Sequence, residues 1–90
     1  MRIEFDNNKR NKTLQRRGLD FARADQVFAN RHFTLQDKRK DYGEDRFITA
    51  GILNDRMVVL VWTQRSNVRR IISMRKANER EQKRYKKYLG

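Results

Sequence analysis

The side chains best suited to chemistry are basic and aromatic, and several gather in the polar stretch 37–46. Tyr42 and Glu44 could position or transfer a proton there, and Arg46 could bind a phosphate. Metal-free cleavage of RNA needs a base near the 2′-hydroxyl, cations around the phosphate and an acid for the leaving oxygen. The residue types suit that chemistry, although a solvated loop with locally paired charges explains this stretch equally well.

Other candidate residues lie near the ends of the expected strands. We expect Arg65 and Arg75, like Arg46, to bind phosphate. His32 could act as a general acid or base, but an ordinary surface histidine is the favoured interpretation. Four further cations are expected to contact RNA, namely Lys38, Arg39, Arg69 and Lys76.

The charge balance is strongly positive, with 23 Lys and Arg against 11 Asp and Glu for a net charge of +12. Residues 64–90 hold ten of these cations and two of the acids, so they alone contribute +8. Such a field favours a polyanionic partner such as RNA. A basic RNA-binding or ribosome-associated protein without catalysis fits the composition too, and exposed aromatic side chains for base stacking would favour it.

Several classes of protein are excluded or not expected. The absence of cysteine excludes a thiol nucleophile, disulfide bonds and cysteine metal clusters. With one histidine and no phosphate-binding glycine loop, we expect neither a bound metal nor a cofactor. The longest apolar run, Met57–Trp62, is far shorter than the ~20 residues that span a bilayer, so we expect a cytoplasmic chain without membrane contact.

A sheet must position the candidate residues, because three apolar runs with short polar breaks predict a three-stranded antiparallel meander. The runs are Phe47–Leu53, Met57–Thr63 and Val68–Met74. The first break, Asn54-Asp55, is typical of a tight hairpin, and the second, 64–67, of a four-residue loop. The middle run is apolar at both side-chain parities, which is typical of a strand covered on both faces.

The third run has a mixed pattern that indicates a strand near a working surface. One parity holds Val68, Arg70, Ile72 and Met74, and the other holds Arg69, Ile71 and Ser73. Each face of a regular strand there would carry both apolar and polar groups.

Around the meander the sequence predicts a short strand, three helices and a long loop. Their expected ranges are a strand at 3–5, helices at about 7–17, 21–29 and 79–89, and a loop at 30–45. Asp6, Asp20 and Asn78 are the expected caps at the starts of the helices, and Gly18 is the expected end of the first. Residues 1–90 are therefore interpreted as one α+β domain.

Three segments in combination resemble the BrnT family of bacterial toxins. They are Asp37-x-Arg39-x-Asp41-Tyr42-Gly43-Glu44-x-Arg46-Phe47, Val59-Leu60-Val61-x-Thr63-x-Arg65, and Arg70-Ile71-Ile72-Ser73-x-Arg75-Lys76-Ala77 with Glu81 and Tyr85. The resemblance implies a RelE-like fold and a ribonuclease toxin that arrests translation. It also implies a BrnA-type antitoxin that carries the DNA-binding domain, in a 2:2 assembly that reaches DNA only through the antitoxin.

The chain departs from the family pattern at three places. Phe5 stands where the family usually has Trp, Arg16-Arg17 precedes Gly18 where the family usually has Lys-His, and Met74 stands in place of Ala. If the family histidine takes part in chemistry, activity here would be reduced or carried by other residues.

The sequence also suggests where an antitoxin would dock. The last helix is expected to present a narrow apolar stripe of Tyr85, Tyr88 and Leu89 between its lysines and arginines. That stripe and an exposed edge of the sheet are the expected docking surfaces.

Overall fold

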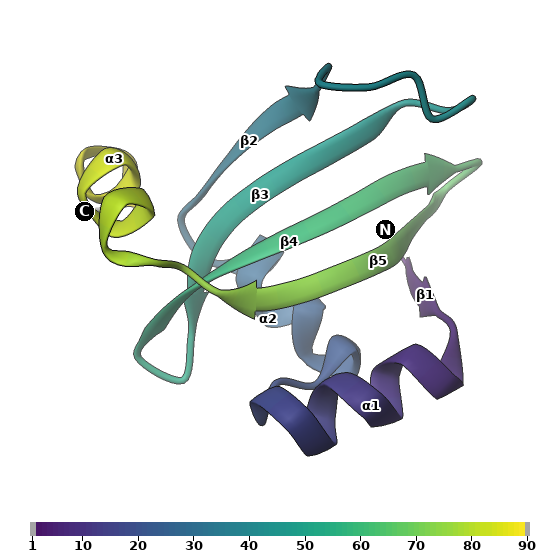
Figure 1. Cartoon of the computed structure of the whole chain (residues 1–90), viewed down its shortest axis with the longest axis horizontal. Helices are drawn as coiled ribbons and strands as arrows, with labels where there is room; N and C mark the ends of the chain where they lie inside the picture. Colours follow the sequence, from purple (N-terminus) through teal and green to yellow (C-terminus); the bar gives the residue numbers. More distant parts are fainter. Residues whose placement is uncertain (1, 90) are drawn as a thin grey trace.

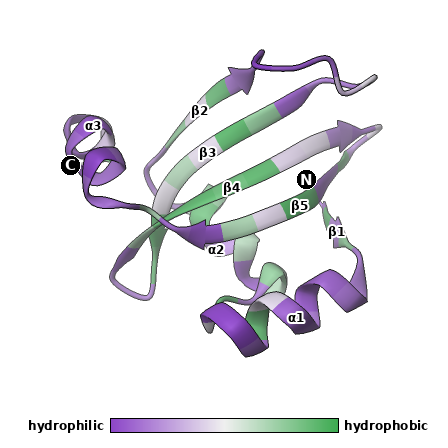
Figure 2. Cartoon of the chain, in the orientation of Figure 1, coloured by the Kyte–Doolittle hydropathy of each residue, from purple (hydrophilic) through white to green (hydrophobic). Residues whose placement is uncertain are grey.

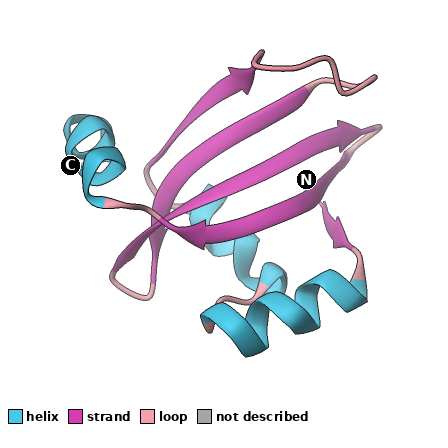
Figure 3. Cartoon of the chain, in the orientation of Figure 1, coloured by secondary structure: helices cyan, strands magenta, loops and turns pink. Residues whose placement is uncertain are grey.

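The computed structural model describes residues 2–89, which fold into a mixed sheet with helices packed against it (Figures 1 and 3). The order of the strands across the sheet is β1-β5-β4-β3-β2. The elements are β1 (Arg2–Phe5), α1 (Asn7–Arg17), the 3₁₀ turn η1 (Phe21–Arg23), α2 (Ala24–Ala29), β2 (His32–Asp37), β3 (Arg46–Leu53), β4 (Arg56–Arg65), β5 (Val68–Lys76) and α3 (Glu79–Leu89). The predicted α+β class is confirmed.

The predicted meander is present but has one more strand than expected. β3, β4 and β5 pair antiparallel in sequence order, and β1 adds parallel to β5 at the edge. The expected loop 30–45 is wrong in its first part, because β2 pairs antiparallel with β3 there. The apolar side chains of β2 are only Phe33 and Leu35. The apolar–polar alternation of this strand is therefore too short and too polar to stand out from the charged residues that follow.

The turns that join β3 to β4 and β4 to β5 are both tight. Asn54 and Asp55 have φ angles of 52° and 64°, which is the backbone of a type I′ hairpin and confirms the first prediction. The expected four-residue loop is wrong, since Arg65 and Val68 pair with each other and leave two residues between the strands. Ser66 makes this shorter turn by adopting a φ of 54°.

A bulge in β5 sorts the side chains that looked mixed in the sequence. Val61 pairs with Ser73 while Trp62 pairs with Ile71, so β5 contains one extra residue at this point. Ile71 and Met74 consequently both face the core, although they have opposite parity. The expectation that each face of this strand mixes apolar and polar groups is therefore wrong at its centre.

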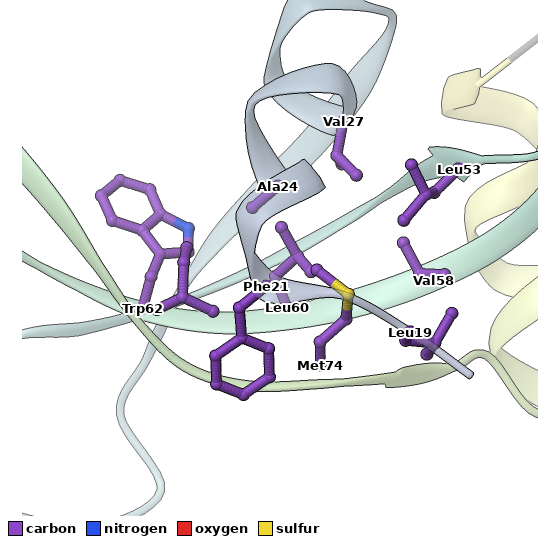
Figure 4. Close-up of a cluster of buried hydrophobic side chains, with 10 residues drawn as sticks. Leu19, Phe21, Ala24, Val27, Leu53, Val58, Leu60, Trp62 and Met74 are labelled. Atoms are coloured by element: carbon purple, nitrogen blue, oxygen red, sulfur yellow. The ribbon is translucent and has the colours of Figure 1, made fainter. Parts of the chain in front are cut away.

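The core lies between the sheet and the segment that runs through η1 and α2 (Figure 4). Its buried side chains are Leu19, Phe21, Ala24, Val27, Leu53, Val58, Leu60, Trp62, Ile71 and Met74. Gly51 of β3 has no room for a side chain, since an added Cβ would lie 2.5 Å from Cγ1 of Val27 in α2. Gly51 thus allows α2 to lie close against β3.

Local hydrogen bonds define the ends of the helices, as predicted. Asp6 accepts from the amides of Asn8 and Lys9 at the start of α1, and Gly18 ends that helix with a φ of 68°. The predicted helix at 21–29 begins as a 3₁₀ turn and becomes α-helical only at Ala24.

The C-terminal helix packs on the other side of the sheet, against β2. The Phe33 ring stacks on Tyr88 with ring centres 4.0 Å apart, and it lies 5.9 Å from the buried Tyr85 ring. The apolar stripe of α3 therefore attaches this helix to its own chain and leaves its charged side exposed (Figure 2). Among residues 2–89, no helix is long and apolar enough to cross a membrane.

Candidate functional site

The central strand separates the core from a second face that the first two helices do not cover. Val58 and Leu60 point into the core, so Val59 and Val61 point to the opposite side. We call this side, defined by Leu35, Ile48, Val59, Val61 and Ser73, the open face. It carries most of the predicted site residues.

A groove of about 480 Å³ lies on the open face beside α3. Its floor is the open face itself, and its rim combines cations and carboxylates from three parts of the chain. The charged residues are Asp37, Lys38, Arg39, Arg75, Glu81 and Arg84. We call this hollow the α3 groove.

Arg75 is held in one orientation at the rim of this groove. Its Nη1 and Nη2 donate to Oε1 and Oε2 of Glu81 at 2.7 and 2.8 Å. These bonds raise the pKa of Arg75 and lower that of Glu81. Glu81 also accepts from the amide of Asn78 in the capping box of α3, so the helix start positions the arginine.

Asp37 organises the loop that follows β2. Its side chain is 2% exposed and accepts from Nε and Nη2 of Arg39 at 2.9 and 3.0 Å and from the Tyr42 hydroxyl at 3.2 Å. The hydrogen bonds from Arg39 hold the pKa of Asp37 well below its usual range. The positive charge of Arg39 also acts to lower the pKa of Arg75, whereas Glu81 raises it. Two segments far apart in sequence thus bring their cations to one groove.

Tyr42 and Glu44 position the other two arginines that the sequence singled out. The Arg46 guanidinium lies over the Tyr42 ring, 4.0 Å from its centre. Glu44 lies between two cations, 3.6 Å from Arg46 Nε and 3.5 Å from Arg65 Nη2. Arg46 Nε is buried and finds no hydrogen-bond partner within the described part of the chain.

The structure divides the three predicted phosphate-binding arginines into two groups. Arg75 pairs with Val59, whereas Arg65 lies six residues further along β4. At a rise of about 3.3 Å per residue, their backbones are about 20 Å apart. One phosphate cannot contact both, so Arg46 and Arg65 form a separate cluster with Glu44.

Two other predicted residues lie on the face opposite the groove. The His32 ring meets Phe28 of α2 edge to face at 5.5 Å, and the Arg69 guanidinium lies 3.9 Å from the centre of the same ring. Burial lowers the pKa of Arg69. Lys76 is likewise outside the α3 groove and lines a small hollow with Arg16, Arg17 and Arg75.

Asp37, Glu81 and Arg84 were missed as site residues by the sequence analysis. Glu81 and Arg84 are three positions apart on α3, which places them on one side of the helix. Asp37 was taken as part of a loop, so its place at the end of an edge strand was not apparent. The helical spacing was a signal that could have identified the first two.

The fold and the groove together define a small, basic α+β protein suited to binding a polyanion. The model of the BrnT family, described as the ribonuclease toxin of a type II toxin-antitoxin system, matches residues 5–81. A search of curated proteins found no match. Because the family model covers most of the chain, this protein belongs to the BrnT family of ribonuclease toxins. A toxin of this type implies an RNA substrate and an antitoxin partner.

Proposed function

We propose that this chain is a single RelE-like domain that acts in the cytoplasm as a metal-independent endoribonuclease and arrests translation. The observation that carries the proposal is the α3 groove, where four cations and two carboxylates surround an apolar floor. Cations fixed before substrate arrives can stabilise the charge that develops on a phosphate during cleavage. We take the bound polyanion to be RNA because the matching family is described as a ribonuclease toxin.

In this proposal RNA lies along the open face from α3 towards the β4–β5 turn. Arg75 binds the reacting phosphate in the α3 groove with Lys38 and Arg39. Arg46 and Arg65 bind other phosphates of the same RNA, because they lie ~20 Å from Arg75 along the sheet. An extended RNA chain would contact both groups at once.

Proton transfer is assigned by the surroundings of each group. The Tyr42 hydroxyl is already bound to Asp37, and its ring supports Arg46, so Tyr42 is a positioning residue. Glu44 lies between Arg46 and Arg65 in the separate cluster, too far from the phosphate at Arg75 to act as its base, so it positions those two arginines. His32 cannot reach that phosphate either, because it lies on the opposite face.

No step in this proposal is assigned to a metal ion. Within residues 2–89, no three His, Asp or Glu side chains come close enough together to hold a metal ion. The carboxylates of the α3 groove are instead bound by arginine. Guanidinium groups would therefore supply the positive charge that a metal supplies in other nucleases.

The partner in this proposal is a BrnA-type antitoxin that carries the DNA-binding domain. The toxin itself would not contact DNA, and a 2:2 complex would bind the operator through the antitoxin. The net charge of +12 supports an acidic surface or segment on that partner.

Expression of the chain alone tests the activity. We expect growth arrest and RNA degradation in cells, and RNA cleavage by the purified protein that EDTA does not inhibit. Arg75→Ala, purified in the same way, controls for a contaminating nuclease, and Arg56→Ala serves as a matched control at an exposed arginine outside the grooves. A folded protein that leaves RNA intact would contradict the proposal and favour a binding protein without catalysis.

A further inference from the structure

The edge of β5 is only partly covered by β1. β1 pairs with Val68–Ile71, whereas β5 continues to Lys76. Beyond β1, Arg17 reaches this edge and donates through Nη1 to the carbonyl of Met74 at 2.9 Å. This bond shows that the Met74 carbonyl points away from β4, so the edge at 72–76 can accept another strand.

A second groove, of about 350 Å³, runs beside this edge and is lined by α1. Among residues 2–89, four cations and no carboxylate line it, and Ile72 adds apolar surface beside the buried Phe21. The cations are Lys9, Lys12, Arg16 and Arg17. We call it the α1 groove.

α1 itself contributes no buried residue, although it lies alongside the sheet (Figure 1). Ile72 and Ser73 on the β5 side of the groove are half-buried, so the surface between this helix and β5 stays partly accessible. A chain that filled the α1 groove would contact both elements.

We propose that an extended acidic segment of the antitoxin docks in the α1 groove and pairs as an added strand with 72–76 of β5. The inference rests on the proposed function for the existence of that partner. A peptide backbone would supply the hydrogen bonds that the rest of this strand edge lacks and would replace Arg17 at the Met74 carbonyl, while acidic side chains would meet the lysines and arginines of α1. RNA would satisfy the charges but not the backbone edge, so the observations favour a peptide.

This position also provides a route to inhibition. Arg75 lines the α3 groove, and it also lines the small hollow beside Arg16 and Arg17 that adjoins the α1 groove. An acidic segment bound along β5 can therefore bring a carboxylate to the same arginine that binds the reacting phosphate. The antitoxin would compete with RNA for Arg75 without entering the α3 groove.

The test uses the full chain and the purified antitoxin encoded with it. We expect Lys9→Glu/Lys12→Glu to weaken the complex at least tenfold by titration calorimetry. The matched control, Lys83→Glu/Lys86→Glu, makes the same change of charge on exposed lysines of α3 and should alter the affinity less than threefold. Amide hydrogen exchange at 72–76 should slow in the complex.

Three results would overturn the proposal. The first is an equal loss of antitoxin affinity in both double variants. The second is slowed exchange at α3 or β2 with none at 72–76. The third is a Lys9/Lys12 variant that keeps its antitoxin affinity but loses RNA affinity. The last would make the groove an RNA path. If the double variant does not fold, Lys12→Glu alone is compared with Lys83→Glu. RNA cleavage by the free wild-type chain tests the proposed function separately, because docking is judged by affinity and exchange alone.

Discussion

The guanidinium of Arg75 and the carboxylate of Glu81 form a pair of parallel hydrogen bonds that joins the end of β5 to the first turn of α3. The arrangement fixes the arginine before any substrate is present. A phosphate must therefore displace the Glu81 carboxylate from Arg75 or share the arginine with it, although the helix cap holds that carboxylate in place.

Arg75→Ala should lower kcat/KM for RNA by about 100-fold, as loss of one fixed donor to a developing charge does. Unfolding free energy should change by less than about 1 kcal/mol, because the pair is partly exposed and Glu81 keeps its bond to the Asn78 amide. RNA cleavage and denaturant unfolding measure the two effects. A larger loss of stability would make Arg75 a structural residue.

Tyr42→Phe should retain activity within about threefold, because it removes one hydrogen bond from Asp37 while the three bonds from the amide and guanidinium of Arg39 remain. Tyr42→Ala removes the ring beneath Arg46 and should raise KM for RNA about tenfold. Steady-state kinetics separate kcat from KM. A Tyr42→Phe enzyme with abolished kcat would show instead that the hydroxyl transfers a proton.

Acid stability should depend on the ion pair between α1 and η1. Arg10 donates to both oxygens of Asp20 at 2.8 Å and lowers the pKa of Asp20 from 3.8 to about 2. Because the folded-state pKa is the lower one, the stabilisation is complete above about pH 4 and is lost as the pH falls towards 2.

Asp20→Asn is the matched variant for this test, since asparagine also caps helices. Wild type should be more stable by about 1 kcal/mol at pH 7, and the difference should shrink below about pH 4 and be mostly lost at about pH 2. Urea unfolding across pH 2–7 measures the difference. A gap that persists at pH 2 would mean that another interaction of Asp20 is responsible.

Gly51→Ala should destabilise the fold by about 1–3 kcal/mol, because the new methyl group would overlap Cγ1 of buried Val27. Val27→Ala makes room for that methyl group, so Gly51→Ala should destabilise the Val27→Ala variant less than it destabilises wild type. Chemical unfolding of the four proteins in this cycle gives the coupling. Additive effects would show that α2 moves away without strain.

Features set by neighbouring residues could be predicted from the sequence. The hairpin at Asn54-Asp55, the caps at Asp6 and Gly18, and the capping box at Asn78 each involve a few residues and short hydrogen bonds. Secondary structure over most of the chain followed from such signals together with apolar periodicity.

Features set by strand register could not be predicted. The bulge beside Ser73 decides which β5 side chains face the core, and no local pattern indicates it. Register also places Arg75 far from Arg65 and puts Arg69 on the opposite face, and no local pattern in the sequence indicates this arrangement. β2 was missed because an edge strand needs few apolar residues.

The alternation of side chains between the two faces of β4 has a consequence for cells that carry two copies of the toxin gene. Core residues such as Leu60 lie on one side of the strand and the candidate site on the other, so a mutation on the open face can abolish toxicity and leave the fold intact. Such a dead copy would keep α1 and the edge of β5. In a cell that carries both copies it would act as a decoy, holding antitoxin away from the active toxin, so a loss of function in one copy would increase the toxicity of the other.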